Sequence, residues 1–122
     1  MRKALEVAVA AIDGSPREGQ IEMAEAVANA LEDRHHLMVQ AGTGTGKSLA
    51  YLVPAMVHGK KVLIATATLA LQRQLVDRDL PKIVPALEEF LGREITYGIY
   101  KGVGNYVCLQ KLNSDEPDPD GE

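Results

Sequence analysis

The stretch AGTGTGKS occupies residues 41–48 and carries three glycines followed by a lysine and a serine. It matches the phosphate-loop pattern G-x-x-x-x-G-K-[ST] except at Ala41, where the pattern has glycine. The glycines permit turns that a Cβ disfavours, so successive N–H groups can face phosphate oxygens. Lys47 is expected to contact the β and γ phosphates, and Ser48 to contact Mg²⁺. The predicted nucleotide-binding residues of the loop are Ala41, Gly42, Thr43, Gly44, Thr45, Gly46, Lys47 and Ser48.

Segments on both sides of the loop alternate between two patterns. Short apolar runs predict strands at 36–40, 62–66 and 95–100. Helical patterns predict helices at 2–12, from Ser15 onward, and at 47–57, 69–78 and 82–91. This order predicts an α/β fold, in which a parallel sheet is flanked by helices. A glycine-rich turn without a ligand is the alternative interpretation of the loop, but a strand before it and a helix after it favour a nucleotide site.

Local signals predict where the helices begin and end. Ser15, Pro16 and Glu18 have the spacing of a capping box with proline at the first helical position. Thr68 is placed to cap the helix that follows it. Pro81 is expected to break or kink the chain before the next helix.

Composition limits the class of protein. The 122 residues suffice for one small domain, and 46% hydrophobic and 25% charged residues are ordinary for a soluble protein. Five of the 17 acidic residues lie in the proline-containing stretch 114–122, which is predicted to be disordered, so the remaining chain is nearly neutral. No apolar run reaches the roughly 18 residues of a membrane helix, so no membrane association is expected. The single cysteine, Cys108, excludes an internal disulfide and favours a reducing compartment.

Three motifs resemble superfamily 2 helicases. The loop variant A-x-T-G-x-G-K-[ST] is typical of that superfamily, and PREGQ at 16–20 resembles its R-x-x-Q element, which implies that Gln20 reads adenine. A solvated helix residue is the alternative for Gln20. The stretch ATATLALQRQL at 65–75 resembles helicase motif Ia, which implies that Thr68 and Gln72 contact the backbone of single-stranded nucleic acid. The alternative is that Thr68 only caps a helix whose solvent-facing side carries Gln72.

The stretch KGVGNYVC at 101–108 resembles the K-G-x-x-N-Y-x-C element of the DinG and XPD branch. In that branch the cysteine is the first of four ligands to a 4Fe-4S cluster. One cysteine cannot hold the cluster, so Cys108 is expected to be a ligand only in a longer chain. The sequence is thereby identified as the N-terminal part of a DinG-like helicase. Residues 1–113 are expected to belong to a RecA-like ATP-binding domain ending at the start of the iron–sulfur insert.

The resemblance implies ATP, Mg²⁺, single-stranded DNA, 5′-to-3′ movement and a role in DNA repair or replication. The sequence has no D-E-A-H stretch, the Walker B element of that family, and no second motor domain. We therefore expect a truncated motor domain that binds nucleotide without useful turnover. A stand-alone nucleotide- or single-stranded-DNA-binding fragment is the alternative. A GTPase is disfavoured because the guanine-reading N-K-x-D element is absent, and no lid or acceptor site of a small kinase is found.

Overall fold

The computed structural model describes residues 1–42 and 46–102. The predicted cluster ligand Cys108, the domain boundary at 113, the acidic tail and the loop residues Thr43, Gly44 and Thr45 lie outside them. The helices are α1 (Arg2–Ala10), α2 (Glu18–Asp33), α3 (Lys47–His58), α4 (Leu69–Arg73), the π-helix η1 (Gln74–Asp79) and α5 (Leu80–Leu91). Within the described part, no helix is both long and apolar enough to cross a membrane.

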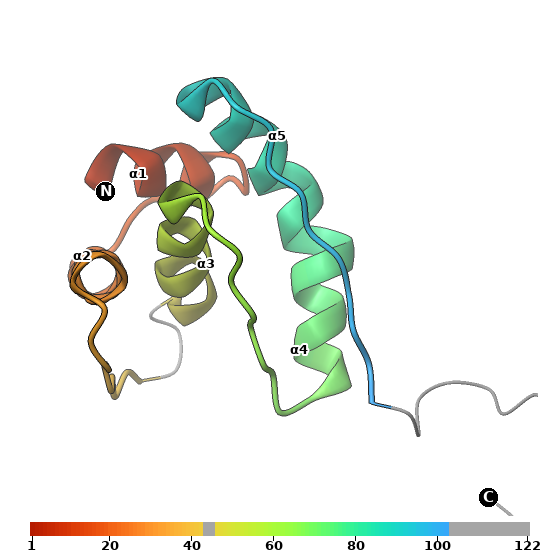
Figure 1. The fold of residues 1–122 in the computed structure, drawn as a ribbon. Coiled ribbons are helices and arrows are strands. Elements are labelled where there is room, and N and C mark those ends of the chain that lie inside the picture. The colour runs from red at the N-terminus through yellow and green to blue at the C-terminus, as the bar shows by residue number, and fades with distance from the viewer. Residues whose placement is uncertain (43–45, 103–122) are drawn as a thin grey trace, which may run out of the picture.

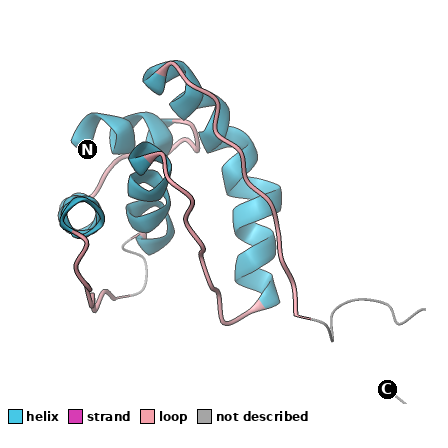
Figure 2. Ribbon diagram, viewed as in Figure 1, coloured by secondary structure: helices cyan, strands magenta, loops and turns pink. Residues whose placement is uncertain are grey.

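The predicted parallel sheet is not present in the described residues, where all regular structure is helical (Figure 2). The three predicted strands are extended but unpaired. Segments 62–66 and 95–100 run in the same direction (Figure 1). They face each other across two cavities of about 540 and 620 Å³ that residues of both line. The prediction failed because a parallel ladder needs neighbouring strands about 4.8 Å apart, and cavities separate these segments.

In each extended segment, the exposure of successive side chains still alternates with the period of two that is expected of a strand. Met38, Leu63 and Tyr100 are 98%, 89% and 84% exposed. Their apolar neighbours are only 37–43% exposed: Leu37, Val39, Val62, Ile64 and Ile99. One side of each segment is therefore partly covered by the protein, and the other is open.

Four helices meet in the main core. Three fully buried alanines, Ala8 of α1, Ala24 of α2 and Ala50 of α3, lie in the centre of the cluster. Leu5 and Leu87 are among the largest side chains that are fully buried in this core, and they bring α1 and α5 together. Small side chains let helix axes approach closely, so this composition allows α1, α2, α3 and α5 to share one core without aromatic residues.

A second cluster joins α3 to η1 and α5 through Leu52, Leu75, Leu80 and Val84. The helix that begins with α4 continues through η1 into α5 without a break (Figure 1). The chain therefore does not break at Pro81, although a new α-helix, α5, does begin at Leu80, next to the position where a restart or kink is predicted. Pro81 lies in the first turn of α5, directly after the π-helical turn, where its missing N–H is accommodated by a locally altered hydrogen-bond pattern.

The predicted capping box is also wrong. Helix α2 begins at Glu18, and its N-cap residue Arg17 is extended and makes no side-chain cap hydrogen bond. The connector before it is tied to α1 instead, because the Gly14 N–H donates to the Val9 carbonyl at 3.0 Å. Holding residue 14 against α1 leaves the next residues to span the distance to α2 in an extended form.

Truncation of Leu87 should destabilise the whole domain. Leu87→Ala removes a fully buried side chain from the four-helix core and should lower the free energy of unfolding by about 2–5 kcal/mol. Phe90→Ala is the matched control on the same helix, because Phe90 is 46% exposed and should lose less than about half as much. Urea unfolding followed by circular dichroism measures both, and equal losses would contradict this packing.

Candidate nucleotide and nucleic-acid sites

The described ends of the glycine-rich loop are held together at the start of α3. Gly46 is the N-cap residue, with φ of 71°, a left-handed conformation that favours glycine. The Lys47 ammonium donates a hydrogen bond to the Ala41 carbonyl at 3.2 Å and so links the two ends of the loop. Among the described residues, no side chain caps α3. With respect to these residues the first N–H groups of the helix are available, as at the anion-binding helix N-termini of phosphate loops.

Gln20 is positioned by α2 against this loop. The residue is 5% exposed, and its Nε2 donates to the Gly46 carbonyl at 3.1 Å. A Cβ at position 46 would overlap the Gln20 amide, so the close approach requires glycine there. The interpretation of Gln20 as a solvated helix residue is therefore wrong. The sequence placed Gln20 and the loop in one site, and the structure brings them into contact.

A cavity of about 870 Å³ opens beside this contact, within the usual range of small-molecule sites, about 300–1,000 Å³. Gly46, Ser48 and Gln20 line it from α2 and α3. Charged side chains on its walls are Asp13, Arg17, Arg78 and Asp79. Sequence reasoning missed the contribution of η1, because no local pattern shows that this turn folds back toward the loop.

The donor set fits a nucleotide carrying Mg²⁺. The described residues contain no group of three or more His, Cys, Asp or Glu side chains that could hold a metal ion by themselves. Mg²⁺ is usually held by few protein ligands together with substrate phosphates. A single hydroxyl, that of Ser48, beside the helix N-terminus is compatible with that arrangement.

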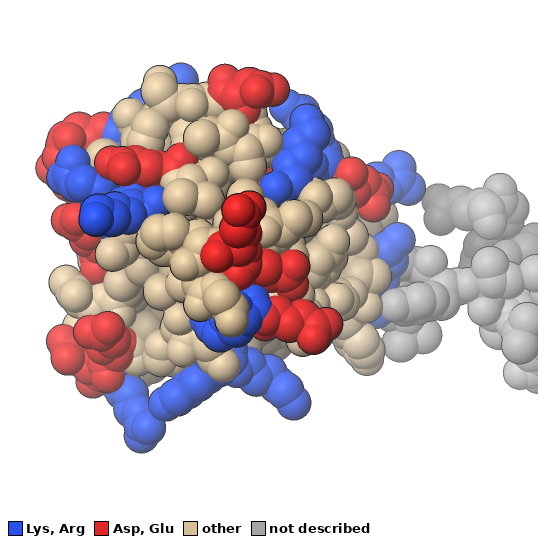
Figure 3. All heavy atoms as spheres, turned by 90° about the horizontal axis from the view of Figure 1, so that it is seen from above, with Lys and Arg blue, Asp and Glu red and all other residues tan. Residues whose placement is uncertain are grey.

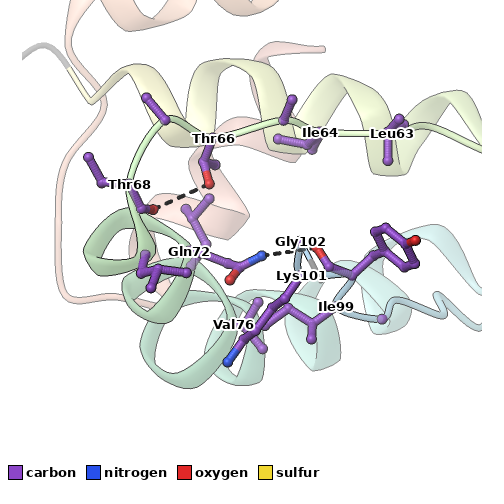
Figure 4. A pocket seen from close by; sticks show the side chains of 15 residues that line it. Leu63, Ile64, Thr66, Thr68, Gln72, Val76, Ile99, Lys101 and Gly102 are labelled. Carbon is purple, nitrogen blue, oxygen red and sulfur yellow. Dashed lines mark hydrogen bonds between the residues drawn. The ribbon is translucent and has the colours of Figure 1, made fainter. Parts of the chain in front are cut away.

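Thr68 and Gln72 lie in a second cavity of about 540 Å³ (Figure 4). Thr68 Oγ1 accepts from the Leu71 N–H at 3.2 Å, which confirms the predicted cap of α4. Gln72 is half-buried, and its Nε2 donates to the Tyr100 carbonyl at 3.4 Å. Its Oε1 is buried and has no hydrogen-bond partner among the described residues, so the side chain does not simply face solvent. The structure therefore brings both predicted nucleic-acid residues to one groove, with Gln72 turned inward.

The surface charge is mixed. In the face seen in Figure 3, acidic and basic side chains are interspersed, and neither sign dominates. This agrees with the near-neutral balance outside residues 114–122. The second cavity itself is lined by one lysine, Lys101, together with the hydroxyl-bearing Thr66 and Thr68.

Comparison with known proteins matches these features to helicases. The family described as DEAD/DEAH box helicase matches residues 20–98. ATP-dependent helicase DinG of Mycobacterium tuberculosis H37Rv is 55% identical over 114 residues, which cover 90% of this chain and 17% of the relative. ATP-dependent DNA helicase YoaA of Escherichia coli K12 is 50% identical over 97 residues, covering 80% and 15%. 3′-5′ exonuclease DinG of Bacillus subtilis 168 is 40% identical over 100 residues, covering 79% and 10%.

No solved structure matches the chain. The chain spans only about a sixth of the length of the mycobacterial relative. The family match covers more than half of the chain and includes Gln20, the loop, Thr68 and Gln72. The chain therefore belongs to the DEAD/DEAH box helicase family and is a DinG-like helicase fragment.

Proposed function

We propose that this chain is the N-terminal, ATP-binding portion of a DinG-like ATP-dependent DNA helicase. The observation that carries the proposal is the hydrogen bond from Gln20 to Gly46. It joins the predicted adenine-reading residue to the end of the phosphate loop on one cavity that Ser48 also lines. Family membership and the names of the relatives support the same assignment.

In this proposal the roles are divided along the cavity. The loop N–H groups and Lys47 bind the phosphates, and Ser48 contacts Mg²⁺. The Nε2 of Gln20 is engaged by Gly46, which leaves the amide oxygen to accept from the amino group of adenine. Gln20 therefore recognises the base and positions the loop with the two ends of one amide.

The nucleic-acid partner is proposed to be single-stranded DNA, bound along the groove at Thr68 and Gln72. Movement from 5′ to 3′, action in DNA repair or replication, and a cytoplasmic location are proposed for the whole protein. Cys108 is proposed as one of four ligands to a 4Fe-4S cluster whose other ligands come from a longer chain.

The second candidate is a nucleotide- or single-stranded-DNA-binding fragment without catalysis, and for the 122 residues by themselves we favour it. The observation behind it is the absence of a D-E-A-H stretch from this sequence. Such a carboxylate holds Mg²⁺ and helps to position the attacking water, so binding does not require it but hydrolysis does.

Substitution of Lys47 should separate specific from non-specific nucleotide binding. Lys47→Ala removes the cation at the loop and should weaken Mg·ATP binding by at least about tenfold. The control Lys61→Ala removes an exposed lysine that lines a different cavity and should leave affinity unchanged. Isothermal titration calorimetry measures both, and equal affinities for the two variants would count against the proposed site.

Hydrolysis by the 122-residue chain should be negligible. Steady-state ATPase turnover with Mg²⁺ and excess single-stranded DNA should stay below about 1 s⁻¹, the low end of typical enzyme turnover. Faster turnover that Lys47→Ala abolishes would show that the chain is a complete catalyst.

Introduction of a negative charge at the α4 cap should test the nucleic-acid groove. Asn and Asp both serve as N-cap residues, so either should preserve the α4 start that Thr68 now caps. Thr68→Asp adds a negative charge beside the expected phosphate path and should weaken oligo-dT binding at least about tenfold, whereas the neutral Thr68→Asn should change it little. Fluorescence anisotropy at low salt gives both affinities. If the two variants bind alike, no phosphate lies near Thr68.

A further inference from the structure

Asp79 is a largely buried residue whose carboxylate has no hydrogen-bond or ion-pair partner among the described residues. It ends η1, is 7% exposed, and lines the cavity that holds Gly46, Ser48 and Gln20. Its side chain makes no cap hydrogen bond to α5. None of the hydrogen bonds or ion pairs formed within the described residues involves this carboxylate. The Asp79 oxygens are not among the fully buried atoms without a partner, so they reach the cavity that the residue lines. A carboxylate that opens onto a cavity without a protein partner is available to accept a hydrogen bond from a ligand.

The chemistry of the cavity restricts that ligand. An ionised carboxylate only accepts hydrogen bonds, and it repels phosphate. A metal ion bound by protein groups alone is disfavoured, because Arg17 and Arg78 line the same cavity and the described residues hold no set of three metal ligands. The amino group of adenine is already assigned to the Gln20 amide oxygen, so the remaining hydrogen-bond donors of a nucleotide are the ribose hydroxyls.

We propose that Asp79 accepts a hydrogen bond from such a donor on the nucleoside, so that η1 forms a wall of the nucleotide site. The inference rests on the proposed function, because it takes the ligand of this cavity to be ATP. The π-helical form of η1 agrees with it, since π turns in helices occur frequently at functional sites. Asp79 thereby becomes a nucleotide-contacting residue on the same continuous helix that begins with Thr68 and Gln72.

The test compares two aspartates of the same turn. Asp79→Ala should weaken Mg·ATP binding by about tenfold in calorimetric titration of the 122-residue chain, because a hydrogen bond to a charged group is lost. The matched control is Asp77→Ala: Asp77 is exposed and does not line the cavity, so affinity should change less than about twofold. If Asp79→Ala binds ATP as the unmodified chain does, the inference is overturned.

Thermal unfolding distinguishes a ligand contact from a structural role. Without nucleotide, Asp79→Ala should unfold at about the same temperature as the unmodified chain, because no hydrogen bond or ion pair of this carboxylate with the other described residues is lost. The rise in melting temperature caused by ATP should be smaller in the variant. A lower melting temperature without nucleotide would mean that Asp79 supports the fold, and would overturn the inference.

Nucleotide analogues identify the donor. The 2′-deoxy and 3′-deoxy forms of ATP each lack one ribose hydroxyl. The analogue that lacks the contacted hydroxyl should bind the unmodified chain more weakly than ATP, and this difference should disappear in Asp79→Ala. If both differences persist in the variant, Asp79 contacts neither hydroxyl and the inference fails.

Lys47→Ala, measured in parallel, distinguishes failure of the proposed ATP site from failure of the proposed Asp79 contact. Loss of binding in Lys47→Ala with normal binding in Asp79→Ala would retain the ATP site and reject the role of Asp79. Normal binding in Lys47→Ala would reject the ATP site itself, and the inference with it.

Discussion

The close packing of α2 on α3 is the constraint on which the rest of the structure depends. Ala24 and Ala50 are both fully buried between these helices, and small side chains allow the two backbones to come close. This proximity places the Gln20 amide on the Gly46 carbonyl, 26 residues away in sequence. A larger side chain at the junction would separate Gln20, the proposed adenine-reading residue, from the loop, even if every motif were kept.

The continuous helix from α4 to α5 connects the two cavities. Thr68 and Gln72 lie at its start on one cavity, and Asp79 lies on the other. Leu75 and Leu80 are buried on either side of this turn and hold it against Leu52 of α3.

The extended segments show what the helices leave uncovered. Sheets of parallel strands are normally covered on both faces. Here the helices partly cover one side of segments 36–40, 62–66 and 95–100, and Met38, Leu63 and Tyr100 remain open on the other. The side-chain alternation of strands is thus present without the backbone pairing that defines a sheet.

Features encoded by neighbouring residues were predictable from the sequence. The start of α3 at Lys47 follows from the glycine before it, and the cap of α4 follows from the hydroxyl of Thr68. The family motifs also indicated the pairing of Gln20 with the loop. Each of these depends on residue types and spacings that can be read along the chain.

Only the tertiary structure decided the rest. Backbone pairing, the turning inward of Gln72, the unbroken passage through Pro81 and the burial of Asp79 beside Ser48 all depend on which segments meet in space. A local sequence pattern predicts helix starts, caps and motif residues. The burial of a side chain and its hydrogen-bond partners are set by contacts between segments far apart in sequence. For that reason the sequence determined that this chain carries a helicase-type nucleotide loop, and the packing determined which side chains surround it.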